Sequence, residues 1–362
     1  MDFTLSAEQT AIRDAGGAVA QKYGAADPGA GIVFASPAAR DALWTELAKA
    51  GVLGAGLPEQ YGGTGGGALE LAVLLEELGR NLAPAPVLES IVSAQVVGAF
   101  GSEAQRARWL SAVVEGSAVL TLSAAAHDLT ATREGGGWRV SGRQVDVCYA
   151  AEATRVLLIA RAGDTEVGLL VDPAANGVTL QSYGTTSDLP EAEIVLQDVL
   201  VGDADAFEGA GIAEWARQRV TVATSALLTG IGLGALEMTA RHTNQRHQFG
   251  RPLSAFQAVA VQAGGGYIDV DTTRLALWQA AWRLDDGRSA EREVAIAKFW
   301  ASEATARVTA TAQHLHGGVG VTLDYPLHHF TLWSKHLELS AGSAREQLNR
   351  IAGLSSRHSA II

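Results

Sequence analysis

The spacing of apolar residues changes twice along these 362 residues, and this change constrains the fold more than any other feature. From Ser6 to about Gly116, apolar residues recur every three or four positions, which is typical of helices that bury one face. Short β-branched runs separated by Gly, Asp, Asn and Pro follow and predict strands. From Ile212 onward the helical spacing returns. The sequence therefore predicts an α+β protein in which helical domains flank a central β domain.

We expect three domains: an N-terminal helical domain at 1–117, a central β domain at 118–210 and a C-terminal domain at 211–362. The strand-like runs are short and closely spaced, which favours a small antiparallel barrel or sandwich. The helices expected in the N-terminal domain include Asp41–Ala50, Ala68–Gly79 and Glu103–Val114. The C-terminal domain holds four long helical stretches, at 212–243, 254–285, 290–314 and 328–352. Such helices bury their apolar faces against one another, so we predict a four-helix bundle.

Charge and composition argue against several classes of function. Lys and Arg total 27 against 39 Asp and Glu, and the net charge of −12 disfavours binding to nucleic acid or to an anionic membrane. The single cysteine, Cys148, excludes an intrachain disulfide and a thiolate-rich zinc site, and it fits a reducing, cytoplasmic setting. The apolar run Val220–Leu236 comes closest to a membrane span. Its Thr, Ser and Gly content predicts a buried helix instead.

Two segments in the C-terminal domain carry residues suited to a phosphate-containing cofactor. The first is RHQFGRPLSAFQAV, Arg246–Val259, and the second is HLHGGVG, His314–Gly320. An arginine can pair with a pyrophosphate, and consecutive glycines let a ligand approach the backbone closely. His314 and His316 lie at i and i+2 and do not face each other on a helix, so we expect no metal site.

In order and spacing, these two segments resemble the flavin-binding signatures of the acyl-CoA dehydrogenase family. Segments in the N-terminal half are also similar to the helical domain of that family: WTELAKAGVL, PEQYGGTG, EELGRNLA and GSEAQ. The resemblance covers nearly the whole chain and implies the fold of the family, with its helical domain, small β domain and four-helix bundle. It also implies FAD as the cofactor, an acyl-CoA substrate, and an electron acceptor such as an electron-transfer flavoprotein.

The same resemblance implies a set of cofactor-binding residues on this chain. In the family, one subunit holds the pyrophosphate and adenine end of an FAD whose reactive ring lies in the neighbouring subunit. The residues that match this half of the site are Arg246, Phe249, Gln257, His314, Gly317 and Gly318. His314 stands where the family has a glutamine, with Gln313 beside it.

The residues that the family uses for catalysis are missing at the matching positions. Desaturation of an acyl-CoA needs a carboxylate that removes the α proton of the thioester. Ala341 stands where most members of the family have a glutamate, and Val220 lies where a minority carry it. We therefore assign no catalytic residue to this chain. The carboxylates near these positions are expected to be solvated helix residues rather than displaced bases: Glu214, Glu237, Glu338 and Glu346.

The segments that meet the flavin ring in the family also differ here. LSAAAHD, Leu122–Asp128, lacks the proline and glycine of the family segment, although Ser123 and Asp128 remain. DVC, Asp146–Cys148, replaces a tryptophan-containing sequence. We expect Cys148 to be a small buried apolar residue rather than a redox thiol.

These differences favour a chain that has kept the cofactor-sharing half of the site and lost the catalytic half. The first hypothesis is the partner subunit of an α2β2 acyl-CoA dehydrogenase, resembling the heteromeric bacterial enzymes of steroid side-chain degradation, in which a second polypeptide supplies the base. The second is a self-sufficient homotetrameric enzyme with a displaced carboxylate base. The third is a non-enzymatic scaffold of the same fold.

Overall fold

The computed structural model describes residues 3–25, 36–123 and 127–359. The chain forms two compact units, each built from separate stretches of sequence. The helical unit comprises residues 1–43, 72–84 and 221–362. The sheet unit comprises residues 44–71 and 85–220. The stretch 1–117 thus contributes to both units, and the division into three domains at 118 and 211 remains a prediction.

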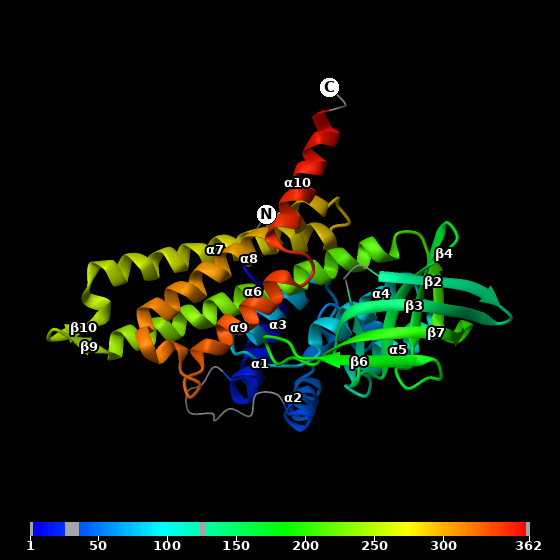
Figure 1. Ribbon diagram of the computed structural model, residues 1–362, viewed down its shortest axis with the longest axis horizontal. Helices are drawn as coiled ribbons and strands as arrows, with labels where there is room; N and C mark the ends of the chain where they lie inside the picture. Colours follow the sequence, from blue (N-terminus) through cyan, green and yellow to red (C-terminus); the bar gives the residue numbers. More distant parts are fainter. Residues whose placement is uncertain (1–2, 26–35, 124–126, 360–362) are drawn as a thin grey trace. The chain divides into compact units, whose positions relative to one another are not determined.

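Long helices build the helical unit, and Figure 1 shows α6, α7, α8 and α9 lying side by side. The first three predicted stretches of the bundle are confirmed, with ends within about three residues of those expected. A capping box begins α1, because the Ser6 hydroxyl accepts the Gln9 amide at 3.1 Å while the Gln9 side chain accepts the Ser6 amide at 3.0 Å. The helices of this unit are α1 (Ala7–Tyr23), α6 (Ile212–Gln245), α7 (Gln257–Asp285), α8 (Glu291–His316), α9 (Leu327–Leu339) and α10 (Ala344–Ser359).

The fourth predicted stretch, 328–352, is not one helix, and in this respect the prediction was wrong. It forms α9 and α10, separated by a turn at Ser340–Ser343. Ala341 has φ +57° and Gly342 has φ +91°, and two successive residues of positive φ cannot continue a right-handed helix. The apolar spacing carried no sign of this break, because both helices keep a helical pattern on either side of it.

Three glycines allow α3 (Ala68–Arg80) and α6 to approach each other backbone to backbone. A Cβ atom at Gly79 would lie 2.3 Å from the Leu227 carbonyl oxygen, and one at Gly230 would lie 2.0 Å from the Glu76 carbonyl oxygen. At Gly234 a Cβ would meet the Arg80 carbonyl oxygen at 2.2 Å. Any side chain at these positions would push the two helices apart, so their packing depends on glycine.

By length and composition, α6 is the one helix among the described residues that could cross a membrane. In the structure 78% of its most apolar window is buried within the protein. Its apolar run therefore belongs to the core, as the Thr, Ser and Gly content predicted.

One eight-stranded sheet forms the centre of the sheet unit, in the order β6-β7-β3-β2-β4-β5-β8 with β1 paired to β4. Most neighbours are antiparallel, as predicted, but β1 runs parallel to β4, and β2 pairs with β4 in parallel at a single position. These parallel pairs were not predicted, because strand spacing does not reveal which distant strands meet. The strands are β1 (Leu120–Leu122), β2 (His127–Glu134), β3 (Gly137–Cys148), β4 (Arg155–Ala162), β5 (Thr165–Val171), β6 (Val178–Tyr183), β7 (Glu191–Gly202) and β8 (Ala206–Gly209).

One face of this sheet packs into an apolar core that includes Leu129, Val140, Leu158 and Ile194. Two further helices complete the sheet unit, α4 (Val87–Phe100) and α5 (Glu103–Val114), and α2 (Pro37–Lys49) and α3 contribute to both units. The predicted helices at Asp41–Ala50, Ala68–Gly79 and Glu103–Val114 correspond to α2, α3 and α5. The predicted order of helices, sheet and helices is thereby confirmed.

Candidate functional site

The RHQFG segment forms a tight hairpin between α6 and α7. Strand β9 (His247–Gln248) pairs with β10 (Arg251–Pro252), so Phe249 and Gly250 form a two-residue turn. Both have positive φ, +53° and +79°, as a type I′ hairpin turn requires. The Phe249 side chain is 92% exposed, and its ring meets Phe256 edge-on at 6.3 Å. A large aromatic residue is thus held in a strained conformation that points it into solvent.

Two cations and a helix N-terminus lie at this hairpin. Arg246 follows α6 directly, and the Arg251 guanidinium lies 4.1 Å from the centre of the Phe256 ring. Neither arginine has a carboxylate partner within the part of the chain that the structure describes. Helix α7 begins at Gln257, with no side chain capping its first amides and no acidic residue in its first turn. Unpaired guanidinium groups beside an uncapped helix N-terminus form a site suited to an anion.

The HLHGGVG segment forms the end of α8 and the 3-10 turn η5 (Gly317–Val321). Gly317 ends α8 with φ +62° and ψ −142°, a conformation that is essentially limited to glycine. Gly317 and Gly318 are exposed, and a Cβ atom built on either would meet nothing within 4 Å. This backbone is therefore open to a ligand. His314 is also exposed on the last turn of α8.

The structure brings the two predicted segments to the same end of the bundle, as Figure 1 shows at the β9–β10 hairpin. The ring of His242, on the last turns of α6, stacks on that of His316 with centroids 4.2 Å apart. Arg246 lies one helical turn beyond His242, and Gly317 follows His316. We call this region, built from Arg246–Gln257 and His314–Gly318, the cofactor end of the bundle.

The two positions that match the catalytic base of the resembled family carry no acid. Ala341 lies in the turn between α9 and α10, and Val220 is buried on α6. We call Ser340–Ser343 the base turn. The amine of buried Lys298 holds this turn, because it donates to the carbonyl oxygens of Glu338 at 3.0 Å and of Gly342 at 3.2 Å. Burial lowers the pKa of Lys298 to about 7.

Each of the four neighbouring carboxylates is engaged in a local contact. Glu214 accepts from Arg217 at 2.5 Å, and Glu338 accepts from Lys335 at 3.0 Å. Glu346 accepts the Ser343 amide at 2.7 Å, which holds its pKa below the ordinary value. The fourth, Glu237, pairs with an arginine of α3. The sequence predicted solvated helix carboxylates, whereas in the structure each of the four is engaged in a local contact. Such contacts do not favour a general base, which needs an available proton-accepting oxygen near its substrate.

A cluster of titratable groups in the sheet unit was not found from the sequence. The Cys148 thiol donates to the Glu191 carboxylate at 3.1 Å, and burial raises the pKa of the thiol well above its ordinary value. Cys148 was predicted to be a small buried apolar residue, but it is half-buried and its thiol makes a polar contact. Burial raises the pKa of Glu89 to about 7. The one available signal was a single acid in the apolar sequence of α4.

In the segment Leu122–Asp128, which matches the family segment at the flavin ring, residues 124–126 lie outside the described residues.

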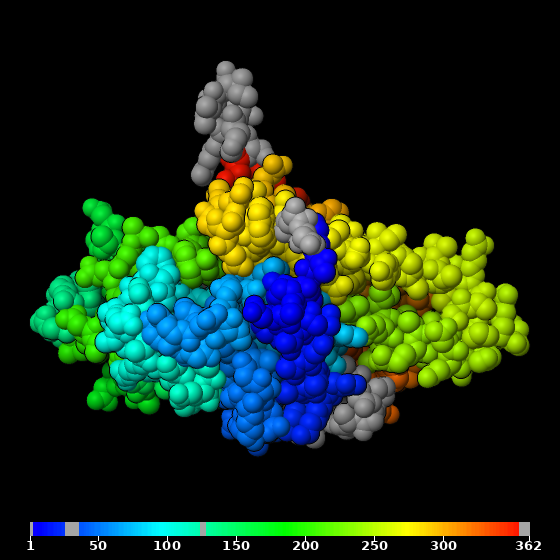
Figure 2. Space-filling view, turned by 180° about the vertical axis from the view of Figure 1, so that it is seen from behind, coloured from blue at the N-terminus to red at the C-terminus, as the bar shows by residue number. Residues whose placement is uncertain are grey.

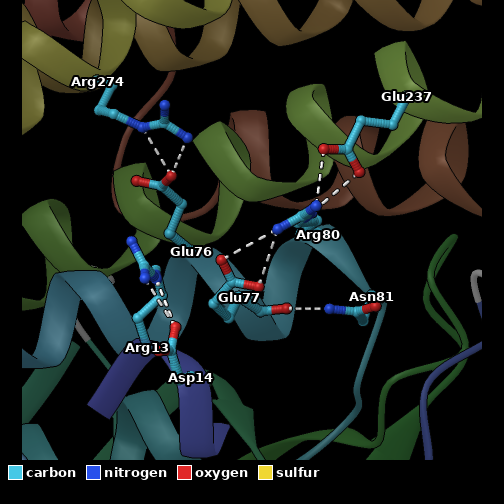
Figure 3. Close-up of polar contacts among 8 residues, drawn as sticks. All are labelled: Arg13, Asp14, Glu76, Glu77, Arg80, Asn81, Glu237 and Arg274. Atoms are coloured by element: carbon cyan, nitrogen blue, oxygen red, sulfur yellow. Dashed lines mark hydrogen bonds and ion pairs between the residues drawn. The ribbon is translucent and has the colours of Figure 1, made fainter. Parts of the chain in front are cut away.

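Figure 3 shows a second charged region of the helical unit, centred on α3. Arg80 pairs with Glu237 at 2.8 Å and with Glu77 at 3.3 Å, and Arg274 donates to Glu76 through Nε at 2.7 Å. Burial raises the pKa of Glu77, and Arg80 opposes this rise. These ion pairs connect α3 to α6 and α7 and complete the glycine-mediated contact between α3 and α6.

A cavity of about 540 Å³ lies beside these ion pairs, lined by Arg13, Asp14, Glu77, Arg80 and Arg241 among others. Its lining is polar, so it does not suit an acyl chain, which needs apolar walls. Arg13 and Arg80 are already neutralised by Asp14 and by the two glutamates of Figure 3. The cofactor end, with its unpaired arginines, is the better site for a phosphate-containing ligand.

Two known family domains match the helical ends of the chain. Models of the acyl-CoA dehydrogenase N-terminal and C-terminal domains match residues 6–117 and 209–354. The acyl-CoA dehydrogenase FadE27 of Mycobacterium tuberculosis is 36% identical over 322 residues, which cover 85% of this chain and 86% of FadE27.

Two solved structures are similar over almost the whole chain. One is described as a Tcur3481-Tcur3483 steroid ACAD variant, with 34% identity, a TM-score of 0.91, and coverage of 99% of this chain and 100% of that chain. The other is the ChsE4-ChsE5 complex of Mycobacterium tuberculosis, with 32% identity, a TM-score of 0.90, and coverage of 98% and 99%. The chain described here belongs to the acyl-CoA dehydrogenase family of flavoprotein oxidoreductases.

Proposed function

We propose that this chain is the partner subunit of a heteromeric acyl-CoA dehydrogenase and that it binds the pyrophosphate and adenine half of a shared FAD. A second chain of the same family supplies the contacts to the flavin ring, the acyl pocket and the catalytic base. One contrast carries the proposal. The cofactor end keeps exposed, unpaired groups, whereas Ala341 and Val220 occupy both positions where the family places its glutamate.

The groups at the cofactor end fit the ADP portion of FAD. A pyrophosphate neutralises Arg246 and Arg251, for which the described residues offer no carboxylate, and the N-terminus of α7 adds partial positive charge. The open backbone at Gly317 and Gly318 admits a ligand at van der Waals distance. Phe249 presents an aromatic face that a planar cofactor can cover.

Held by these residues, FAD would supply the acceptor for the hydride of the acyl-CoA β carbon, with an electron-transfer flavoprotein as one candidate acceptor of the electrons. The part of this chain is to bind and orient the cofactor. Arg246 fixes the pyrophosphate, and Phe249 and Gln257 limit the access of water to it. Ala341 and Val220 have no titratable atom, so removal of the α proton falls to the second chain.

The outer face of α7 supports a subunit partner. Val261 and Ile268 are 66% and 65% exposed, and Gly264 and Gly265 lie between them on the same helix. Figure 2 shows this surface of α7 uncovered, in yellow-green to yellow. An apolar helix face of this kind is typical of a protein interface. The two similar solved structures, whose descriptions name two proteins each, support a partner of the same family.

Purification of the chain alone and together with a co-expressed second acyl-CoA dehydrogenase chain tests the proposal. We expect a colourless preparation of the chain alone, and a yellow complex that desaturates acyl-CoA thioesters when the two are made together. A yellow, active preparation of the chain alone supports the self-sufficient enzyme. No flavin in either preparation supports the scaffold.

A further inference from the structure

A cluster of three rings, His242, His316 and Tyr325, lies at the cofactor end, and the proposed function uses none of them. His316, the last residue of α8, is only 6% exposed. Its Nδ1 lies 2.8 Å from the Ala312 carbonyl oxygen, and its Nε2 lies 3.2 Å from the Tyr325 hydroxyl. Because a carbonyl oxygen can only accept, Nδ1 carries the hydrogen. In the neutral ring, Nε2 then accepts from the Tyr325 hydroxyl.

The bond between His316 and Tyr325 closes the glycine loop. The two residues are nine positions apart, and Gly317, Gly318 and the rest of η5 lie between them. The loop is further tied by the Thr322 amide, which donates to the Val319 carbonyl oxygen at 3.2 Å. Without the Tyr325 hydroxyl, the C-terminal end of the glycine loop is no longer hydrogen-bonded to His316 at the end of α8.

His242 connects this loop to the arginine. Its ring lies on the His316 ring with an interplanar angle of 23°, and it comes from α6, the helix that leads to Arg246. The Arg246 amide donates to the His242 carbonyl oxygen at 2.8 Å, so the backbone positions of these two residues are coupled. The stack thereby sets the separation between Arg246 and the backbone of Gly317.

We propose that His242, His316 and Tyr325 are positioning residues that hold the two parts of the ADP-binding surface, Arg246 and Gly317–Gly318, at the spacing the cofactor requires. The inference rests on the proposed function and adds to it. In this role the three rings need no contact with the cofactor. They act through the residues on either side of them, in the way that supporting side chains orient the groups of a binding site.

Burial, with a smaller contribution from nearby charges, keeps the two histidine rings neutral. Burial and then Arg246 lower the pKa of His242. Burial lowers the pKa of His316 to about 4, with His242 acting in the same direction. Arg241 lies close enough to oppose the rise that burial causes in the pKa of Tyr325. A protonated His316 would add a cation to this group and replace the acceptor for the Tyr325 hydroxyl with a donor.

The test measures the affinity for FAD of the complex with the co-expressed second chain, together with the unfolding temperature of the same complex without flavin. Tyr325→Phe removes the hydroxyl and keeps the ring. Thr305→Val is the matched control. The Thr305 hydroxyl on α8 donates to the Leu228 carbonyl oxygen of α6 at 2.9 Å, in the interior of the bundle and away from the glycine loop. Each variant loses one hydrogen bond, which is part-buried at Tyr325 and buried at Thr305.

We expect Tyr325→Phe to weaken the binding of FAD and of ADP about tenfold, while Thr305→Val lowers the unfolding temperature by a similar amount and leaves both affinities unchanged. Riboflavin, which lacks both phosphates and the adenosine, is expected to bind equally to all variants. His242→Ala, which removes the stack without changing the glycine loop, provides a second route if Tyr325→Phe fails to assemble, with the same selective loss of FAD and ADP.

The outcomes separate this inference from the proposed function. If Arg246→Ala loses FAD while Tyr325→Phe and His242→Ala bind it normally, the cofactor assignment holds and the positioning role is wrong. If Thr305→Val weakens FAD binding as much as Tyr325→Phe does, the rings only stabilise the fold. If none of the variants, Arg246→Ala included, changes FAD binding, the proposed function itself is wrong.

Discussion

Two turns of the helical unit have almost the same backbone and opposite surroundings. Phe249 and Gly250 at the cofactor end have φ +53° and +79°, and Ala341 and Gly342 in the base turn have φ +57° and +91°. The first turn exposes 92% of its aromatic side chain. The second is held from within, because Lys298 donates to the Gly342 carbonyl oxygen and Gln347 donates to the carbonyl oxygens of both turn residues.

The difference indicates which of the two turns is available to bind a ligand or a second chain. A strained turn persists only when its surroundings determine it. The base turn has that support inside the fold, and its polar groups are satisfied without a substrate. The turn at Phe249 leaves its ring almost fully exposed, and the described residues offer no carboxylate to Arg246 or Arg251, which favours a ligand or a second chain as the group that completes it.

Removing the internal support of the base turn should have the largest effect. Lys298→Met deletes an amine that donates to Ser302 and to two backbone carbonyl oxygens. We expect the free energy of unfolding to fall by about 3 kcal/mol, because buried acceptors lose their donor. Lys335→Met, which removes an exposed lysine paired with Glu338, is the control and should cost less than about 1 kcal/mol. Equal losses in urea unfolding would show that Lys298 does not hold the turn.

At the cofactor end the effect should appear in binding rather than in stability. We expect Arg246→Ala to weaken FAD binding by the assembled complex by about ten- to a hundredfold, because a charge-assisted contact worth about 1.5 to 3 kcal/mol is lost. Assembly should be preserved. Flavin content after gel filtration measures the effect, and Arg292→Ala, at the other end of α8, controls for the change in charge. An unchanged flavin content would contradict the assignment of this surface.

Two groups, His316 in the helical unit and Glu89 in the sheet unit, should change the free energy of unfolding with pH in opposite directions. The folded pKa of His316, about 4, lies below its ordinary 6.5, so the stability it contributes is complete above pH 6.5 and is lost as the pH falls toward 4. The folded pKa of Glu89, about 7, lies above 4.5, so its contribution is complete below 4.5 and is lost as the pH rises toward 7. Urea unfolding from pH 4.5 to 7 should show a weaker rise of stability with pH in His316→Gln. The rise should become steeper in Glu89→Gln. If the free energy of unfolding changes equally with pH in the wild type and in both variants, neither assignment holds.

The smallest effects are expected at the four carboxylates near the base positions. Glu214→Gln, Glu237→Gln, Glu338→Gln and Glu346→Gln should each leave turnover by the flavin-loaded complex within a few-fold, because each carboxylate is occupied in a local contact. Turnover is measured with a panel of acyl-CoA thioesters after bound FAD has been confirmed. A hundredfold fall in any one of them would identify a displaced base and favour the self-sufficient enzyme.

The sequence predicted those features that depend on local pattern. The helices of the bundle follow the spacing of apolar residues, and the two cofactor segments were found because their glycines, arginine and phenylalanine lie close together in the chain. It did not reveal the base turn as a break between α9 and α10, because a helical pattern continues on both sides of Ala341. Positive φ at alanine leaves no mark in composition.

Features made by distant residues were also missed. The parallel pairing of β1 with β4 and the contact of Cys148 with Glu191 depend on which strands meet, and spacing along the chain carries no such information. The stack of His242 on His316 joins residues 74 positions apart on different helices. In the sequence, His316 was considered only as one of two histidines with the wrong spacing for a metal.

The exposed face of α7 has a consequence for the synthesis of this protein. Side chains such as Val261 and Ile268, left in water together with Phe249, favour self-association of a newly made chain before any specific contact can form. Surplus copies would then be removed by proteases or lost to aggregates. The quantity of this protein in a cell is expected to follow the amount of whatever covers that face. If the proposed second polypeptide covers it, balanced production of the two chains matters more than the expression level of either.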